Sequence, residues 1–549
     1  MKSEFNLIDE PWIMVMRLDC EIETVSIKTL FEKAHQYKRL AGEMPAQDNA
    51  ILRLLIAILY SVFSRVDIDG EECEIEDEED ALERWKNIWD LKHFPIKPIE
   101  DYLKQYHNRF YLIDDKKPFY QIPEANIGTY YNASKLMAHI SEGNNKTRIF
   151  SERNGKDKRK LDYAEATRWL IYINAYDDAS AKKSKEYKKN NKDSSSKSPG
   201  VCWCGKLGNI EAVGENLYQV LLLNLTFLKD GIDVWEPIQN DFRHCAAWEL
   251  DNPRKGERCE IITPANPAAL LTLQSRRILL DIQSQKIVGY HVLSGDFFEP
   301  ENAFEEQMTI WGSKEDKKKT IIYPRRYNIS KRSWREFSSL NVDTSARVPG
   351  IVNWIFRLMQ ENILSKNDNV HFKNISIYYD SNSSSIVNTY YDELSFHKLL
   401  LDNVGKKWRT WIENEIKNCE ICANEIGKLE QKIMLASGIS EADINNKPQT
   451  NKELFFNRID LSVRKWIFQL DPSSDDEKYV NVLRKIVREK ALKIGKEMVD
   501  QIKDIQALYG RKIVEEKNNK KKVRNCSVLD SYEKFKKGIW STTKELSNE

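Results

Sequence analysis

The sequence lacks the features of a membrane or secreted protein. No run of apolar residues approaches the roughly 18 that a membrane-spanning helix needs. The opening residues, MKSEFNLIDEPW, are mixed polar and acidic and contain no apolar core of a signal peptide. We therefore expect no signal peptide and no association with a membrane.

Cysteine and net charge are also scarce. The nine cysteines are odd in number and irregularly spaced, so they do not form a disulfide framework and fit a reducing cytoplasm. The formal net charge is only +1 at pH 7, so the charge of the whole chain does not indicate nucleic-acid binding. Such binding would need lysine and arginine concentrated in one place.

Signatures of catalysis are missing as well. The eight histidines are scattered, and we find neither a histidine-pair metalloprotease motif nor the glycine-flanked serine of a hydrolase. Cys419 and Cys422 have the C-x-x-C spacing, but they lie on a charged helical run where we expect them to share one face of a bundle. The sequence therefore predicts a protein that is not an enzyme and needs no cofactor.

A zinc site is the alternative for a second group of residues. Structural zinc sites usually show regularly spaced C-x-x-C pairs, whereas this group has a C-x-C pair and a distant couple. Isolated buried thiols are the favoured interpretation, and zinc binding stays open. The group consists of Cys202, Cys204, His244, Cys245 and Cys259.

The length and the apolar periodicity define the fold class. A chain of 549 residues with 41% hydrophobic residues suits two or three domains. Apolar spacing predicts helices over residues 28–40, 47–63, 163–176 and 216–228. Strands are expected at 269–280 with 286–293, and at 374–379 with 385–391.

Beyond residue 392 helical spacing dominates. The helical segments are 393–436, 452–470, 477–513 and 528–546, with polar breaks at 445–451, 472–476 and 518–525. Four such segments predict a four-helix bundle. The expected fold is thus α+β, with a large mixed N-terminal domain over residues 1–392 and a C-terminal four-helix bundle over residues 393–549.

A lysine-rich segment leads directly into a glycine-rich one. Residues 177–200 cannot bury a core, so we expect a solvated loop. The spacing of Gly200, Gly205 and Lys206 matches part of a nucleotide-binding loop. Leu207, however, stands where that loop needs a hydroxyl for magnesium, and no buried strand precedes it. The lysines are Lys182, Lys183, Lys185, Lys188, Lys189, Lys192 and Lys197.

Lysines beside a glycine backbone favour contact with duplex DNA. Lysine side chains bind phosphates, and glycines such as Gly200, Gly205 and Gly208 let the backbone approach a groove closely. We therefore assign Lys182, Lys183, Lys185, Lys188 and Lys189 to DNA binding together with the glycine segment.

Six segments, read in order, identify a family. They are FNLIDEPWI (5–13), LAGEMPAQDNAILRLLIAILY (40–60), KPFYQ (117–121), GENLYQVLLLNL (214–225), VWE (234–236) and LTLQSRRILL (271–280). Together they resemble the CasA family, the large subunit of type I-E CRISPR Cascade complexes. The resemblance covers roughly residues 1–340, and the helical C-terminal part is similar in pattern only.

The resemblance implies a function in RNA-guided antiviral defence. Such subunits recognise a short protospacer-adjacent motif (PAM) in double-stranded DNA and help to open the duplex, so that an R-loop with the guide RNA forms. They then recruit a helicase-nuclease in trans. The implied partners are the guide RNA, the target double-stranded DNA, the other Cascade subunits and that nuclease, while base pairing reads most of the target sequence.

The resemblance also implies positions for the contacts. The family's glycine loop against the PAM falls at Gly200, Gly205, Lys206 and Gly208. Its guide-RNA-handle contact falls at Phe150, Ser151 and Glu152.

Two further positions depart from the family. The wedge hairpin falls at Asn382, Ser383 and Ser384, with Ser383 in place of the family's glutamine. The PAM-facing lysine of relatives falls at Ser294, with Lys286 nearby. We therefore expect the opening of DNA to depend on other residues of the hairpin, Asn382 or Tyr379.

Two other functions compete with this interpretation. One is a stand-alone nucleic-acid-binding or scaffold protein, and the other is an ATPase or metal-dependent nuclease. Migration of the chain in a large ribonucleoprotein particle would distinguish the Cascade subunit from the first, and a metal-dependent cleavage assay would test the second.

The lysine segment generates a prediction. Replacing four of its lysines by glutamine should weaken binding to all DNA sequences alike, because phosphate contacts carry no sequence information. Each lost contact should lower the slope of log affinity against log salt concentration by about 0.9. Anisotropy titrations at several salt concentrations measure this slope, and an unchanged slope would contradict contact with DNA.

Overall fold

The computed structural model describes residues 4–142, 153, 158–180, 200–251, 261–317, 319–447, 449–474, 478–517 and 520–546. The chain forms two compact units. The first comprises Met1–Lys331, Thr344–Ser365 and His371–Glu393, and the second comprises Arg332–Asp343, Lys366–Val370 and Leu394–Glu549. The sequence-based domain division at residue 392 stays a prediction.

The first unit is built around one apolar helix, α2 (Pro45–Phe63). A helix that is apolar on all sides must be buried on all sides, and α6 (Tyr163–Tyr176) and α9 (Pro267–Leu271) pack against it. The length and mean hydropathy of α2 would suit a membrane span, but 94% of its most apolar window is buried inside the protein. We therefore interpret it as a core helix.

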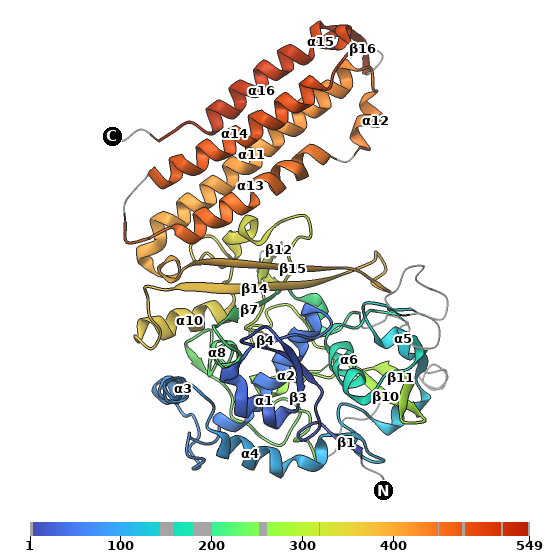
Figure 1. Ribbon diagram of the computed structural model, residues 1–549, viewed down its shortest axis with the longest axis vertical. Coiled ribbons are helices and arrows are strands. Elements are labelled where there is room, and N and C mark those ends of the chain that lie inside the picture. Colours follow the sequence, from blue (N-terminus) through green and yellow to red (C-terminus); the bar gives the residue numbers. More distant parts are fainter. Residues whose placement is uncertain are drawn as a thin grey trace. The chain divides into compact units, whose positions relative to one another are not determined.

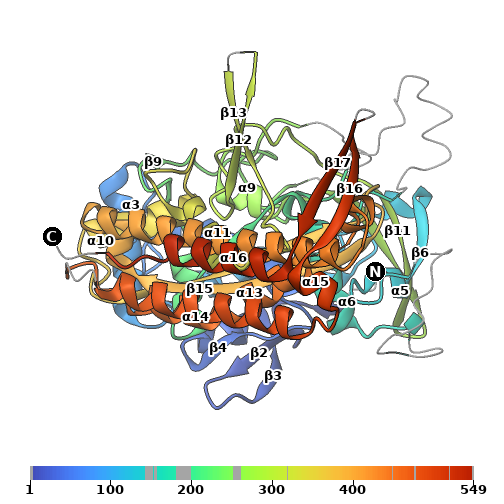
Figure 2. The same cartoon turned by 90° about the horizontal axis from the view of Figure 1, so that it is seen from above.

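Small sheets surround this core (Figure 1). The three-stranded sheets have the orders β3-β2-β4, β10-β11-β6 and β15-β14-β7, and the two-stranded ones are β1-β5, β8-β9 and β12-β13. The β12-β13 ribbon projects from the unit (Figure 2). The strands are β1 (Glu4–Asn6), β2 (Ile13–Arg17), β3 (Ile22–Val25), β4 (Tyr37–Leu40), β5 (Tyr111–Ile113), β6 (Thr129–Asn132), β7 (Asn209–Val213), β8 (Leu228–Lys229), β9 (Asp233–Val234), β10 (Arg276–Gln283), β11 (Lys286–Ser294), β12 (Trp311–Asp316), β13 (Lys319–Pro324), β14 (Asn369–Tyr379) and β15 (Ile386–His397).

Short helices fill the spaces between these sheets. Several begin with a side-chain cap, as where the Asp162 carboxylate accepts from the Glu165 amide at the start of α6 (2.7 Å). The remaining helices of this unit are α1 (Ile27–Lys33), α3 (Glu78–Leu91), α4 (Ile96–Gln105), α5 (Ala133–Leu136), α8 (Leu217–Leu223) and α10 (Gly350–Gln360).

The second unit is a helical bundle. Its four long helices lie side by side in Figure 1, and apolar residues at helical spacing, such as Ile412, Cys419 and Ile426, line its core. The mixed first unit and this bundle confirm the predicted α+β fold with a C-terminal four-helix bundle. The elements are α11 (Lys406–Ala436), α12 (Glu441–Asn445), α13 (Thr450–Gln469), α14 (Lys478–Asp500), α15 (Ile505–Tyr509), β16 (Arg511–Lys517), β17 (Lys520–Cys526) and α16 (Val528–Thr542).

Several predicted elements were wrong in type or length. The helix expected at 28–40 ends at Lys33, because residues 37–40 pair with β2 instead. Residues 269–271, expected as strand, belong to α9, which starts at Pro267 and is capped by the Asn266 side chain. The helix expected at 216–228 ends at Leu223.

In the second unit, two segments differ from the expected helices. Residues 393–397 continue strand β15, so the first bundle helix begins only at Lys406. Residues 511–513 were expected at the end of a helix, and residues 520–525 were expected in a polar break. Both stretches belong instead to the antiparallel hairpin β16-β17. Gly510, with φ of +148°, lies just before this hairpin in a backbone conformation that ends the helical path.

A buried ion pair ties α2 to a distant loop. The Arg53 guanidinium donates to both carboxylate oxygens of Glu306 at 3.0 and 2.8 Å, and the two side chains are 3% and 0% exposed. The Trp203 indole also donates to Glu306 at 2.7 Å. Removing the arginine would leave a buried carboxylate without its counter-charge.

We predict that Arg53→Met lowers the free energy of unfolding by about 3–5 kcal/mol, the usual cost of an unpaired buried charge. Chemical denaturation followed by intrinsic fluorescence measures the change. Arg17→Met is the control, because Arg17 and Asp19 pair at 2.8 Å with both side chains 51% exposed. Its cost should stay below about 1 kcal/mol, and equal losses in the two variants would contradict the prediction.

Candidate nucleic-acid interface

Three segments that are distant in sequence meet in the first unit. They are the end of α6 with residues 177–180, the glycine segment 200–208, and the tip of the β14-β15 hairpin at 380–385. The Cys202 amide donates to the Asp177 carbonyl at 3.0 Å, and the Ala179 amide donates to the Ser383 carbonyl at 2.6 Å. The structure therefore brings together two of the groups that the sequence indicated separately.

The glycine segment is not a nucleotide-binding loop. Strand β7 follows it, whereas a nucleotide-binding loop is followed by a helix. Its middle, Trp203–Lys206, is a short 3-10 turn, and the Trp203 side chain is buried with its indole on Glu306. The segment is thus anchored to the core of the unit.

The three glycines differ in their surroundings. A Cβ at Gly205 would lie 2.3 Å from the Tyr379 hydroxyl, and one at Gly208 would lie 2.6 Å from the Arg325 carbonyl. Both are therefore required by packing inside the protein. Gly200 has a φ of +95°, and no heavy atom of the described residues lies within 4 Å of the place of a Cβ, so of the three glycines it is the one that these residues do not enclose.

Lys206 and Arg326 flank the glycine segment. The Lys206 ammonium lies 5.7 Å from the ring centroid of Phe297, and burial lowers the pKa of this lysine. The Arg326 guanidinium donates to the Gly205 carbonyl at 2.6 Å and lies 5.0 Å from the Tyr379 ring. Lys206 therefore stacks on the protein, and it is half-buried.

Asp380 builds the hairpin tip. Its carboxylate accepts from the Ser384 amide at 2.7 Å and from the hydroxyls of Ser384 and Ser385 at 2.9 and 2.8 Å. Its carbonyl accepts from the Ser383 amide at 2.8 Å, which closes the turn. Side chains such as Asp and Ser favour turns because they bond to nearby backbone groups in this way.

The tip presents one large polar side chain to solvent. Asn382 is exposed, whereas Ser383 is half-buried with a φ of +54°. The Tyr379 hydroxyl donates to the Tyr176 carbonyl at 2.6 Å, so this ring is held against α6. Of the two hairpin residues considered for opening DNA, Asn382 is the one that faces outward.

Other predicted contacts lie elsewhere. Ser294 is 1% exposed at the end of β11, where it is the ladder partner of Arg276. Lys286 begins the same strand, eight residues or about 27 Å away, so it does not replace a lysine at Ser294. Lys182, Lys183, Lys185, Lys188, Lys189, Phe150, Ser151 and Glu152 lie outside the described residues.

Three of the residues that hold the segments together were not predicted from the sequence: Arg276, Arg326 and Asp380. Two of them left a signal. Arg276 stands inside the apolar run LTLQSRRILL, and a charge in a buried strand requires partners. Asp380 precedes a run of Ser and Asn, which is a turn-forming composition.

The thiols and histidine considered for zinc have other surroundings. Cys202 and Cys204 are buried, and burial raises the pKa of Cys204 to about 11. His244 bonds to Asp241 at 2.8 Å and to Glu236 at 2.9 Å. Among the residues that the structure describes, no cluster of three or more His, Cys, Asp or Glu side chains is arranged to hold a metal ion. Cys259 lies outside those residues.

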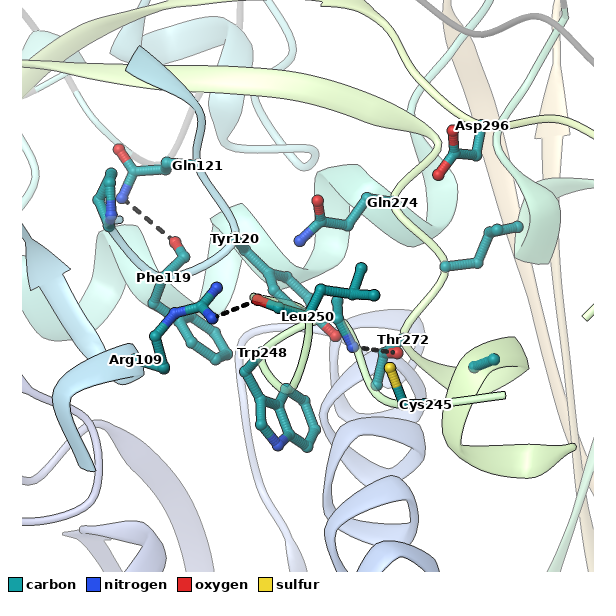
Figure 3. A pocket seen from close by; sticks show the side chains of 14 residues that line it. Arg109, Phe119, Tyr120, Gln121, Cys245, Trp248, Leu250, Thr272, Gln274 and Asp296 are labelled. Carbon is teal, nitrogen blue, oxygen red and sulfur yellow. Dashed lines mark hydrogen bonds between the residues drawn. The ribbon is translucent and has the colours of Figure 1, made fainter. Parts of the chain in front are cut away.

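A separate cavity in the first unit is small (Figure 3). Arg109, Trp248, Gln274 and Asp296 are among its lining residues, and its volume is about 30 Å³. The Arg109 guanidinium donates to the Leu250 carbonyl at 2.7 Å. A cavity needs about 10–15 Å³ to hold one water molecule, so this one has space for only a few waters.

Comparisons with known proteins agree on one family. The family described as CRISPR-associated protein Cse1 matches residues 6–494. A CRISPR-associated protein CasA/Cse1 from Thermus thermophilus is 31% identical over 237 residues, which are 43% of this chain and 42% of that protein. The aligned part thus spans less than half of that relative.

Solved structures match over nearly the whole chain. Cse1 of Thermobifida fusca has a TM-score of 0.81 at 22% identity and covers 99% of both chains. A chain of a CRISPR RNA-guided surveillance complex has a TM-score of 0.70 at 15% identity, over 98% of this chain and 100% of that one. At these identities the structures show the shared fold. With the family match across residues 6–494, they establish that the chain belongs to the CRISPR-associated Cse1 (CasA) family.

Proposed function

We propose that this protein is the large subunit of a type I-E Cascade complex. In this role it recognises the PAM in target double-stranded DNA, assists duplex opening and R-loop formation with the guide RNA, and recruits a helicase-nuclease. The observation that carries the proposal is the meeting of the glycine segment, the ends of the lysine-rich segment and the hairpin tip in a member of the Cse1 family. No catalytic step is assigned to the chain itself.

The open glycine suits the approach of a DNA groove. The minor groove is only about 6 Å wide, so a side chain at the point of closest contact would clash. Among the three glycines of the segment, Gly200 is the one with no heavy atom of the described residues within 4 Å of the place of a Cβ. Minor-groove readout mainly distinguishes A·T from G·C pairs, and a reader at this position should therefore tolerate several related PAMs.

The hairpin tip suits the role of a wedge. Opening a base step costs a few kcal/mol of unstacking, and an exposed side chain can replace part of the lost stacking. Asn382 is the larger of the two exposed residues at the tip, the other being Ser381, and Asp380 bonds across the turn. This arrangement supports DNA opening without the glutamine of the family.

The bundle suits positioning rather than reading of sequence. A hollow of about 370 Å³ lies between α11, β17 and α16, and three lysines (Lys428, Lys432 and Lys534) line it together with Glu425 and Asp530. Lysines bind phosphates without distinguishing bases. We propose that the bundle contacts neighbouring Cascade subunits and a strand of the opened DNA.

The alternative is a stand-alone nucleic-acid-binding or scaffold protein. Expression with and without the other subunits distinguishes the two functions. The Cascade subunit should co-purify with RNA in one large cytoplasmic particle that binds PAM-containing duplex DNA. A chain that binds DNA equally well alone, with no PAM preference, would support the alternative.

We predict that Gly200→Ala reduces PAM-dependent binding roughly tenfold, about 1.4 kcal/mol, because the methyl group occupies the space left for the groove. Gly70→Ala is a matched control, since Gly70 has a similar φ of +88° and its nearest atom to a Cβ is 3.7 Å away. Both variants carry a strain of about 1–2 kcal/mol, but only the first should weaken DNA binding in a mobility-shift assay. Equal effects would show that strain alone is responsible.

We predict that Asn382→Ala slows duplex opening several-fold, because it removes the exposed side chain of the tip. Ser383→Ala should change opening little, since the bond from the Ala179 amide goes to the Ser383 backbone. Stopped-flow fluorescence of 2-aminopurine next to the PAM measures the rate. Loss of opening in Ser383→Ala alone would identify the serine as the wedge.

A further inference from the structure

A buried arginine lies where the three segments of the candidate interface meet. Arg276, the first residue of β10, is 1% exposed. Its Nε donates to the Asp177 carboxylate at 2.7 Å, and its Nη2 donates to the carbonyls of Asp178 at 2.6 Å and Gly200 at 3.1 Å. One planar guanidinium therefore bonds to both the end of α6 and the start of the glycine segment.

These bonds join two points that are far apart along the chain. Asp178 and Gly200 are separated by 22 positions of sequence, yet their carbonyls accept from the same nitrogen. Two neighbouring hydrogen bonds also require these segments to lie close together. They run from the Cys202 amide to the Asp177 carbonyl and from the Ala179 amide to the Ser383 carbonyl. The guanidinium thus sets the position of Gly200 relative to the hairpin tip.

The chemistry of the site requires an arginine. A buried cation is stable only when its charge and its donors are satisfied, and Asp177, 5% exposed, supplies the counter-charge. Burial is the largest single effect on the pKa of Arg276 and acts to lower it, but Cys202, Asp177 and Asp178 together raise this pKa above its ordinary value. A lysine keeps the charge, but its compact ammonium lacks the rigid fork that reaches several acceptors at once.

We propose that Arg276 is a positioning residue of the DNA interface, holding Gly200 and the Asn382 tip in one fixed arrangement. The inference rests on the proposed function. Arg276 itself touches no solvent, and it acts through the backbone of Asp178 and Gly200. Replacing the guanidinium should make these segments more mobile without unfolding the unit.

The next residue in the strand offers a matched control. Arg277 is also 1% exposed, and its guanidinium donates to the Asp296 carboxylate at 2.6 Å and to the Gln274 carbonyl at 2.8 Å. Adjacent strand residues point to opposite faces of the sheet. Substitution at Arg277 therefore disturbs an equally buried ion pair on the other face of β10.

The experiment compares Arg276→Lys with Arg277→Lys in the assembled complex. Hydrogen exchange followed by mass spectrometry reports on peptides that contain Ala179 and Cys202. In Arg276→Lys we expect these amides to exchange about tenfold faster and the affinity for PAM-containing duplex to fall about tenfold, with subunit and RNA content unchanged. In Arg277→Lys both readouts should stay at the wild-type level, although thermal unfolding shifts similarly.

The remaining outcomes contradict either the positioning role of Arg276 or the proposed function. Equal affinity in Arg276→Lys and wild type, or equal losses in the two variants, overturns the positioning role. If Arg276→Lys does not assemble, Asp177→Asn replaces it, and the same faster exchange and weaker binding are expected. A wild-type complex without PAM-dependent binding overturns the proposed function, and the inference with it.

Discussion

The buried charge of Arg276 is the constraint on which the candidate interface depends. A guanidinium that is 1% exposed must find acceptors inside the protein. In this fold it finds them at Asp177, Asp178 and Gly200, which lie on two segments with residues 181–199 between them. Satisfying one side chain therefore brings the end of α6 and the glycine segment together. The hydrogen bond from the Ala179 amide to the Ser383 carbonyl then holds the hairpin tip beside these two segments.

A second buried ion pair, between Arg53 and Glu306, also holds the glycine segment. The Trp203 indole and the Arg53 guanidinium share the Glu306 carboxylate, so the segment is bonded to the central helix α2 as well. The close packing at Gly205 and Gly208 adds steric constraint. Because these contacts are buried and directional, they favour one backbone conformation at the surface. Such rigidity suits a surface that must fit a narrow groove.

The small size of the candidate interface suits the RNA-guided recognition that we propose. In the function that we propose, the protein reads only a short motif, because base pairing with the guide reads the rest. A few preorganised backbone and side-chain groups, centred on Gly200 and Asn382, are enough for such a task. The bundle has a core of apolar residues at helical spacing. It suits docking and phosphate contact, which need little chemical specificity.

The sequence by itself determined the elements that local patterns control. The helix at residues 163–176 was predicted at its observed bounds, because Asp162 caps it and its apolar spacing is regular. The α+β class and the four-helix bundle followed from the same periodicities, and the ordered motifs identified the family. Tertiary structure alone decided that residues 37–40 form a strand and that packing encloses Gly205 and Gly208, whereas no described heavy atom lies within 4 Å of a Cβ at Gly200. It also decided that Arg276 joins two segments 22 positions apart. Pairing and burial depend on partners distant in the chain, and no local pattern specifies which partner satisfies a buried charge.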